Sequence, residues 1–474
     1  MLTYTRCMDS ALCVPLMIDS AIFCDYLRSR GASATEAASA LAYLFKLNEG
    51  GATGVDPGFF NQSATLLSLL EGLPAQPTLV SASAENDNDS AAGPSGSVAS
   101  SGGGRVVGSV LCAGLSCVDM QLLRAADPAT REAIAPFRGC EVTAGGSVSN
   151  SASALRAMGV DAAVMTCAGE DGHGSELLRI YEEQGIDTTL VLREASVSTS
   201  LAVLPVFESG GRGCWVDLSA NELLTPECML AALSSSEAAH LRRDVRALLV
   251  GYPHLLSGLQ GEALKELLAR ASDCLEAEPI REGLGAPLLA IDVNGATLGA
   301  FADADAVLGP ALPLADLLHA NLDEACHIAG VDAGALDEAS ATEEELMERV
   351  AAPLLAAGVA VVAITLGPHG AFVAVTSDSE RLERSAALGR CARGWVGSAV
   401  RLPALPLEGE LNANGAGDAF TSGMVAAMLW QSDDGASMSL QDAVSVALGS
   451  ARQRVDSARR AKPEAVGDLL ACTA

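Results

Sequence analysis

The chain has 474 residues, of which 49% are hydrophobic, so it can bury a sizeable core and still carry an attachment. Its formal net charge of −30 argues against nucleic acid or an anionic membrane as the main partner, because both require a basic surface. The 13 cysteines are an odd number without a C-x-x-C pair, which indicates reduced thiols rather than a disulfide framework. Since no apolar run approaches the ~18 residues that span a bilayer, we expect a cytoplasmic protein.

Residues 1–80 are expected to form a helical extension, because residues 21–47 and 60–73 place apolar side chains at helical spacing. The beginning of the chain lacks the basic region, uninterrupted apolar stretch and cleavage site of a secretory signal. Residues 81–104 consist largely of Ser, Ala, Gly, Asn and Asp without apolar periodicity, which is typical of a flexible linker. We therefore expect the main domain to occupy residues 105–474.

From residue 105 onward, short runs of Val, Leu and Ala alternate with longer amphipathic stretches, as in parallel strands joined by crossover helices. The expected strands are residues 106–113, 162–167, 247–250, 288–292 and 359–365. The expected helices are residues 148–158, 175–184, 262–271, 343–357, 417–429 and 440–461. Two segments, residues 120–143 and 201–218, break this rhythm and have the character of extended or hairpin structure. The pattern predicts an α/β domain with a mostly parallel sheet.

A pattern suited to anion binding lies near the C-terminus, where residues 411–420 have the sequence LNANGAGDAF. The small residues Gly415, Ala416 and Gly417 let successive backbone N–H groups converge, and the positive end of the following helix adds its partial charge there. Asp418 in the first helical turn is placed to accept a proton from an alcohol that attacks a phosphorus atom. The alternative is an aspartate that only caps a helix after a glycine turn.

Polar residues suited to a polyol lie near the first strand. Asp119 follows that strand, where ligands collect in open α/β sheets, and its carboxylate can accept hydrogen bonds from paired hydroxyls. Gly145 and Gly146 permit close approach of the backbone, and Asn150 offers both a donor and an acceptor. The alternative is a Gly-Gly turn in which Asn150 satisfies free N–H groups of the next helix.

Two further segments are candidates for contacts to a nucleotide and its metal. Asn321 and Glu324 are three residues apart at a helix start, and one carboxylate and one amide suffice for Mg²⁺, which keeps several waters. Residues 365–370, TLGPHG, follow a buried-looking strand, and their glycines would admit a nucleotide. A solvated helix start and a simple strand-to-strand turn are the respective alternatives.

Taken in order, these segments resemble the ribokinase-like, or PfkB-type, carbohydrate kinase family. Residues 411–420 are similar to its D-T-x-G-A-G-D signature, residues 144–152 (AGGSVSNSA) to G-G-x3-N-x-A, residues 321–324 (NLDE) to N-x-x-E, and residues 365–370 to T-x-G-x-x-G. The resemblance implies a three-layer α/β/α fold with a small β lid, formed by residues 120–143 and 201–218. It also implies an ATP-dependent kinase with Mg²⁺ as cofactor.

The resemblance assigns a role to each candidate residue. Asp418 is the catalytic base, Gly415, Ala416 and Gly417 form the anion hole, and Asp119, Gly145, Gly146 and Asn150 bind the acceptor. Thr365, Gly367, Gly370 and Asn414 are assigned to ATP, while Asn321 and Glu324 hold the metal through water. The expected acceptor is a small sugar; a nucleoside is the alternative, because residues 414–420 look rather like adenosine kinase. A homodimer is a further possibility.

The chain departs from the family pattern at Asn412 and Ala413, which stand where the family has Asp-Thr. In relatives those positions help to shape a monovalent-cation site, so activation by K⁺ is in doubt. The departure also leaves open a catalytically silent, kinase-like scaffold or regulatory protein. Apparent insertions at residues 273–287 and 377–398 are expected to extend surface loops.

Overall fold

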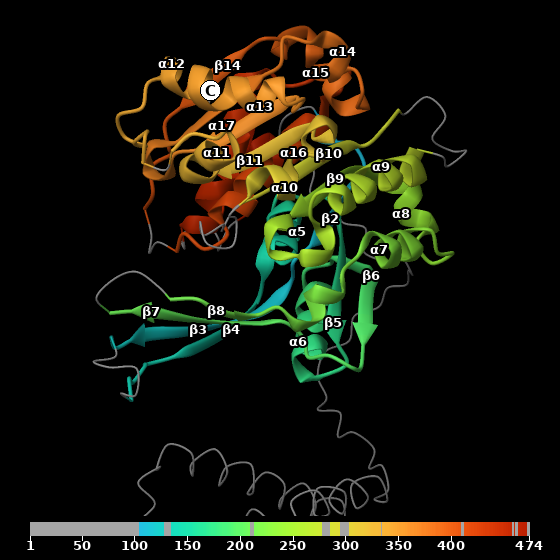
Figure 1. The fold of residues 1–474 in the computed structure, drawn as a ribbon, viewed down its shortest axis with the longest axis vertical. Helices are drawn as coiled ribbons and strands as arrows, with labels where there is room; N and C mark the ends of the chain where they lie inside the picture. The colour runs from blue at the N-terminus through green and yellow to red at the C-terminus, as the bar shows by residue number, and fades with distance from the viewer. Residues whose placement is uncertain are drawn as a thin grey trace, which may run out of the picture. The chain divides into compact units, whose positions relative to one another are not determined.

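A computed structural model describes residues 104–127, 134–208, 213–276, 285–293, 303–332, 334–408, 412–456, 459 and 463–471 (Figure 1). The expected helical extension and all of the expected linker except Gly104 lie outside these residues. Within the described ranges, no helix combines the length and apolarity that crossing a bilayer requires.

The main sheet has nine strands in the order β14-β13-β12-β11-β10-β9-β2-β5-β6. All pairings from β6 to β12 are parallel, whereas β13 pairs antiparallel with both β12 and β14. In chain order the strands are β2 Ser109–Gly114, β5 Ala162–Gly169, β6 Asp187–Glu194, β9 Val245–Gly251, β10 Leu288–Asp292, β11 Leu317–Asn321, β12 Val361–Thr365, β13 Ala371–Val375 and β14 Ala399–Leu402. The family's mostly parallel sheet is therefore present.

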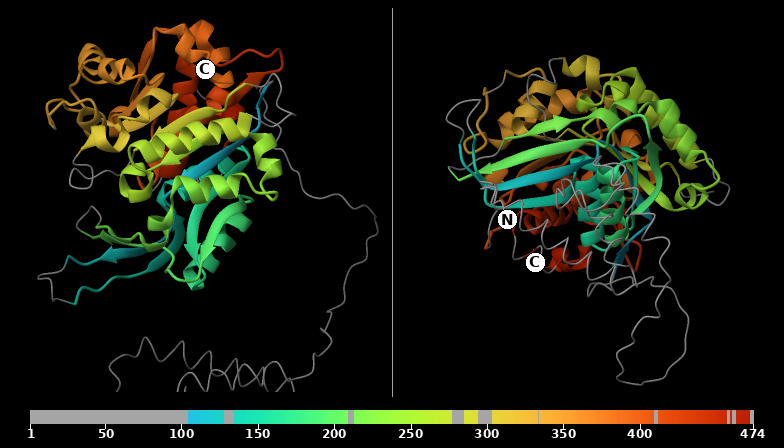
Figure 2. Two further views of the ribbon diagram at one scale, coloured as in Figure 1. Left: turned by 45° about the vertical axis from the view of Figure 1, so that its right-hand side comes forward. Right: turned by 90° about the horizontal axis from the view of Figure 1, so that it is seen from below.

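Both faces of this sheet are buried, because alternate side chains of each strand enter different apolar clusters. Leu111, Leu248 and Ile291 point into one cluster, whereas Val110 and Leu249 point into the other. Figure 2 shows the red C-terminal helices on one side of the sheet and yellow-green helices on the other. The first layer contains α7 Pro226–Leu233, α9 Glu262–Glu276, α10 Ala304–Leu308, α11 Leu322–Ile328 and α13 Ala352–Ala356; the second contains α5 Gly146–Ala157, α6 Gly172–Glu183, α15 Ala386–Trp395, α16 Ala416–Leu429 and α17 Leu440–Val455. The three-layer α/β/α prediction is confirmed.

A second, four-stranded sheet stands apart from the main one, in the order β4-β3-β7-β8 (Figure 1). Its strands are β3 Cys117–Ala125, β4 Cys140–Gly145, β7 Leu201–Phe207 and β8 Trp215–Asp217. Strand β3 begins three residues after β2 ends, so the position of Asp119 is tied directly to the edge of the main sheet. A short two-stranded sheet, β1 Gly104–Val106 with β15 Trp430–Ser432, completes the strands of the described residues.

The expectation that residues 377–398 form a surface loop is wrong. This segment contains α14 Ser379–Leu382 and most of its remainder is α15, whose Leu388 and Trp395 side chains are buried in the core. The indole N–H of Trp395 donates to the backbone oxygen of Met438 at 2.9 Å. The apolar periodicity of α15 is typical of a helix. The interpretation of residues 377–398 as an inserted surface loop did not take this periodicity into account.

Replacing Trp395 by Ala should destabilise the fold by about 3–5 kcal/mol, because it empties a fully packed site and removes a buried hydrogen bond. Trp215→Ala is the matched control, since that side chain is 62% exposed and Trp395 only 1%. Urea unfolding followed by far-UV circular dichroism measures both. Equal midpoints for the two variants would contradict the packing of α15.

Candidate active site

Asp418 is the third residue of α16 and is completely buried. The helix begins after Gly415, which adopts φ 76° in the left-handed region that favours glycine. One carboxylate oxygen, Oδ2, accepts hydrogen bonds from Asn150 Nδ2 at 3.0 Å and from the Tyr252 hydroxyl at 2.9 Å. The other, Oδ1, has no hydrogen-bond partner among the described residues. Among the described residues, this buried acceptor atom therefore keeps its hydrogen-bonding capacity.

The protonation of Asp418 is controlled by opposing effects. Burial raises the pKa of its carboxyl well above the usual range, and the negative charge of Asp292 raises it further. The hydrogen bonds from Tyr252 and Asn150 and the charge of Arg454 act in the opposite direction. A carboxylate with a raised pKa is a stronger proton acceptor, which is the property that a general base requires.

Asn150 lies on α5 between Asp418 and Arg454, and both ends of its amide are engaged. Arg454 Nη2 donates to Asn150 Oδ1 at 3.2 Å, and Arg454 Nε donates to the backbone oxygen of Asn414 at 2.9 Å. Asn414 Nδ2 in turn donates to Asp119 Oδ2 at 3.3 Å. These contacts connect Asp119, Asn414, Arg454, Asn150 and Asp418 into one network. The structure therefore brings together residues that are up to 335 positions apart in the chain.

Gly145 is required by close packing against Asp119, and Gly146 by close packing against Leu115 and Ser116 before β3. A Cβ atom at Gly145 would lie 1.9 Å from Asp119 Oδ1, far inside the contact distance. Gly146 has φ +78°, and a Cβ there would lie 2.7 Å from the backbone oxygen of Leu115. The two glycines thus let the first turn of α5 approach the carboxylate of Asp119, which is 5% exposed.

Asn321 and Glu324 form a capping box at the start of α11. Asn321 Oδ1 accepts from the Glu324 backbone N–H, and Glu324 Oε2 accepts from the Asn321 backbone N–H, both at 2.9 Å. In the described part of the chain, no group of three His, Cys, Asp or Glu side chains is arranged to hold a metal ion. The pair thus caps α11 and holds its oxygens at the start of the helix, which is compatible with the expected contact to Mg²⁺ through water.

Thr365 ends β12, and the turn to β13 passes through Gly367–His369. Gly370 has φ +98°, and a Cβ there would lie 1.9 Å from the Leu402 backbone oxygen, so this turn requires glycine. The Thr365 hydroxyl lies 3.3 Å from His319 Nε2, and His319 Nδ1 lies 3.0 Å from Asp292 Oδ1. A buried polar chain therefore runs behind the expected nucleotide turn.

Sequence reasoning missed four residues of this region: Tyr252, Asp292, His319 and Arg454. Asp292 is the last residue of an expected strand and Tyr252 follows β9. Because ligands bind at the carboxyl ends of parallel strands, both positions could have been predicted as site residues. Burial, followed by the charges of Asp418 and Asp292, raises the pKa of the Tyr252 hydroxyl, and Glu324 adds a smaller contribution. Tyr252 thus stays protonated and donates to Asp418.

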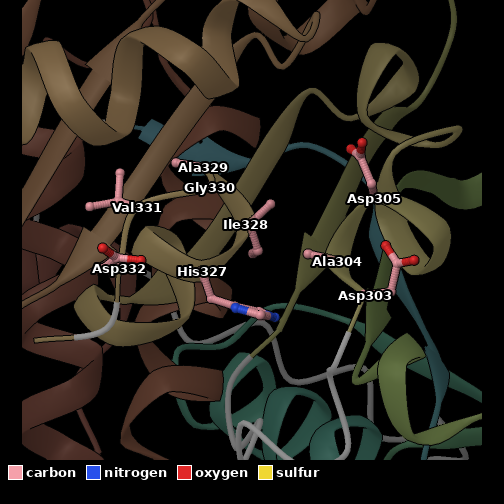
Figure 3. Close-up of a pocket in the computed structure, with 9 residues that line it drawn as sticks. All are labelled: Asp303, Ala304, Asp305, His327, Ile328, Ala329, Gly330, Val331 and Asp332. Atoms are coloured by element: carbon pink, nitrogen blue, oxygen red, sulfur yellow. The ribbon is translucent and has the colours of Figure 1, made fainter.

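A separate hollow of about 560 Å³ lies between α10 and the C-terminal end of α11 (Figure 3). Its polar lining consists mainly of Asp303, Asp305, His327 and Asp332, and it contains none of the predicted site residues. Because these side chains are chiefly acidic, this hollow is poorly suited to the phosphates of a nucleotide.

Comparison with known proteins decides the family. The model of the pfkB family of carbohydrate kinases matches residues 108–463. The chain belongs to this family. It is 26% identical over 241 residues to the ribokinase of Staphylococcus aureus (strain COL), covering 50% of the chain and 66% of that enzyme. It is also 24% identical over 289 residues to the ribokinase of Haemophilus influenzae, covering 61% of the chain and 75% of that enzyme.

Solved structures agree in fold. The structure of Arabidopsis thaliana ribokinase, complexed with ribose and ATP, superposes with a TM-score of 0.55 at 17% identity. The match covers 77% of this chain and 99% of that one. A pfkB carbohydrate kinase domain therefore occupies most of the chain.

Gly145→Ala should destabilise this kinase domain by about 1–3 kcal/mol, because the added methyl group overlaps the Asp119 carboxylate. Gly172→Ala is the matched control, since a Cβ there meets nothing within 4 Å and its backbone is not left-handed. Chemical unfolding of both variants measures the difference. If Gly145→Ala were as stable as Gly172→Ala, the contact between α5 and Asp119 would be incorrect.

The raised pKa of Asp418 predicts a pH-dependent stability. An unfolded aspartate titrates near pH ~3.9, so above that pH the native state binds more protons than the unfolded state until the folded pKa is passed. The unfolding free energy should therefore fall as pH rises through this window, by up to ~1.4 kcal/mol per pH unit.

Asp418→Asn lacks this titration, so its stability relative to the unchanged protein should improve steadily from acid to neutral pH. Urea titrations at several pH values measure the trend. Asp434→Asn is the control, because hydrogen bonds from Ser432 lower the pKa of that exposed carboxyl. Parallel curves for the unchanged protein and Asp418→Asn would show that Asp418 is not perturbed.

Proposed function

We propose that this pfkB-family protein is an ATP-dependent phosphotransferase that phosphorylates a hydroxyl of a small sugar. The observation that carries the proposal is the buried Asp418 carboxylate at the start of α16, whose Oδ1 accepts no hydrogen bond from the part of the chain that the structure describes. An attacking hydroxyl needs a nearby proton acceptor of this kind, placed beside backbone N–H groups that favour a phosphate.

Acceptor binding is assigned to Asp119 and Asn150. The Asp119 carboxylate can accept hydrogen bonds from sugar hydroxyls, and Asn150 presents its amide beside Asp418. Gly145 and Gly146 allow the backbone to approach this place closely. Binding the hydroxyl next to Asp418 lowers the entropic cost of bringing the reacting atoms together.

In the proposed step, Asp418 Oδ1 accepts the hydroxyl proton as the sugar oxygen forms a bond to the γ-phosphorus and the bond to the β-phosphate oxygen breaks. The backbone N–H groups of Gly415, Ala416 and Gly417 stabilise the charge on the transferred group. Thr365, Gly367, Gly370 and Asn414 are assigned to ATP. Asn321 and Glu324 would hold Mg²⁺ through water, and the ion would supply positive charge to the phosphates.

The four-stranded sheet β4-β3-β7-β8 is proposed to act as a lid over the acceptor. It carries Asp119 on β3 and ends at Gly145 on β4, so its position is coupled to the acceptor residues. A phosphotransferase requires such a cover, since water in an open site would compete for the phosphoryl group.

A substrate panel tests the function. We expect ATP-dependent ADP release with free pentoses and hexoses, and Asp418→Asn should lower it by several orders of magnitude while nucleotide binding, measured by calorimetry, persists. Asp434→Asn on the surface is the control and should keep full activity.

Other outcomes separate the alternatives. Transfer to nucleosides and not to sugars would identify a nucleoside kinase instead. If the unchanged protein binds the nucleotide but transfers phosphate to neither sugars nor nucleosides, it is a catalytically silent scaffold. This alternative is considered because Asn412 and Ala413 stand where the family has Asp-Thr.

A further inference from the structure

The loop before α16 does not fit the monovalent cation that the family resemblance implies. Position 412 carries an amide instead of a carboxylate, and Asn412 Oδ1 already accepts from the Asn414 backbone N–H at 3.0 Å. The backbone oxygen of Asn414 accepts from Arg454 Nε at 2.9 Å. A bare ion needs several oxygen ligands at once, and here two of the loop oxygens are already hydrogen-bonded by the protein.

The guanidinium of Arg454 nevertheless supplies a positive charge beside the loop that precedes α16. The guanidinium lies against the loop so closely that a Cβ at Gly415 would be 2.9 Å from Arg454 Nε. Gly415 is the residue at which α16 begins, and its left-handed backbone directs the N–H groups that follow. The charge is fixed by a covalent side chain and needs no ion from solution.

Arg454 also determines which way the Asn150 amide faces. A guanidinium has only donors, so it must meet Asn150 Oδ1, and the amide nitrogen is thereby directed to the acceptor oxygen of Asp418. When Asp418 is protonated its hydroxyl can itself donate, so without Arg454 the amide oxygen could then turn toward Asp418. The acceptor-binding side chain and the anion loop are thus held by the same cation.

We propose that Arg454 is a positioning residue that replaces a dissociable monovalent cation, holding the loop before Asp418 and fixing the Asn150 amide in one orientation. The proposal rests on the sugar kinase function proposed above. It assigns this chain a transfer reaction that does not depend on K⁺. The charge of Arg454 also opposes the rise in the pKa of Asp418 and thereby favours the ionised carboxylate, which is the form that accepts a proton.

The first test is the salt dependence of the unchanged protein. We expect equal kcat/KM in K⁺, Na⁺ and tetramethylammonium salts at matched ionic strength, and no thermal stabilisation specific to K⁺. A requirement for K⁺ in either measurement would overturn the proposal.

The second test replaces the guanidinium. Arg454→Met keeps a long apolar stem but loses the charge and the donors, so the acceptor KM should rise at least about tenfold, as expected for a lost charged hydrogen bond. Arg454→Lys should recover only part of this loss, because an ammonium lacks the planar fork that reaches both oxygens. Arg452→Met is the matched control on the same helix, where Arg452 pairs with Glu464 at 3.6 Å, and it should change the acceptor KM less than threefold. Equal effects of the two methionine variants would contradict a specific role.

Chemical rescue gives an independent readout. Arg454 borders a small groove of about 110 Å³ lined by Ser153, Ala157 and Ser450 among others. We expect low millimolar guanidinium to restore acceptor binding to Arg454→Ala, measured by calorimetry without ATP, whereas urea at the same concentration should not. Rescue by urea or by K⁺ alone would overturn the assigned role.

A measurement without catalysis separates this proposal from the proposed function. Thermal unfolding of Arg454→Met, Asn150→Ala and the double variant forms a cycle, and we expect shifts that do not add because the two side chains are hydrogen-bonded. Additive shifts would refute the link between Arg454 and Asn150. If the unchanged protein phosphorylates no acceptor, the proposed function fails while this cycle still decides the role of Arg454.

Discussion

The arrangement of the site depends on a carboxylate, Asp418, that is buried at the start of a helix, and within the described ranges only its Oδ2 accepts hydrogen bonds. Burying a charge without solvent is costly unless hydrogen bonds and nearby cations compensate it. Asn150, Tyr252 and Arg454 provide part of that compensation. The desolvation that these groups do not offset raises the pKa of Asp418. A raised pKa strengthens the tendency of the carboxylate to accept a proton.

The parallel sheet explains why these groups meet. Asp119 follows β2, Tyr252 follows β9, and Asp292, Asn321 and Thr365 are the last residues of β10, β11 and β12. Since all of these strands are parallel, their carboxyl ends lie along one edge of the sheet, where open α/β folds bind ligands. The acid of α16 and the amide of α5 approach this edge from a neighbouring layer.

Glycine sets how closely the elements approach each other. At Gly145 a side chain would overlap Asp119, and at Gly415 it would overlap Arg454 and Asn150. These positions join the four-stranded sheet, the helix α5 and the anion loop into a continuous unit. Movement of the four-stranded sheet would therefore displace Asp119 and the start of α5, which is the coupling that the proposed lid requires.

The amino-acid sequence was enough to predict the α/β class, the strands expected at residues 162–167, 247–250, 288–292 and 359–365, and the glycine-rich start of α16, because hydrophobic periodicity and turn chemistry are local properties. The strand expected at residues 106–113 is divided between β1 and β2. It did not reveal β6, β11, β13 and β14 as strands. It also misassigned α15 to a loop and extended α17 beyond Val455.

The pairs of distant side chains that share a hydrogen bond became known only from the folded arrangement of the chain. Arg454 gave no signal, since an arginine near the end of a helix is usually solvated, and its importance comes from Asn150 and Asn414 lying opposite it. The reciprocal hydrogen bonds of the Asn321 and Glu324 capping box likewise became visible only in the folded chain. Contacts across some 300 residues depend on packing, which no local pattern encodes.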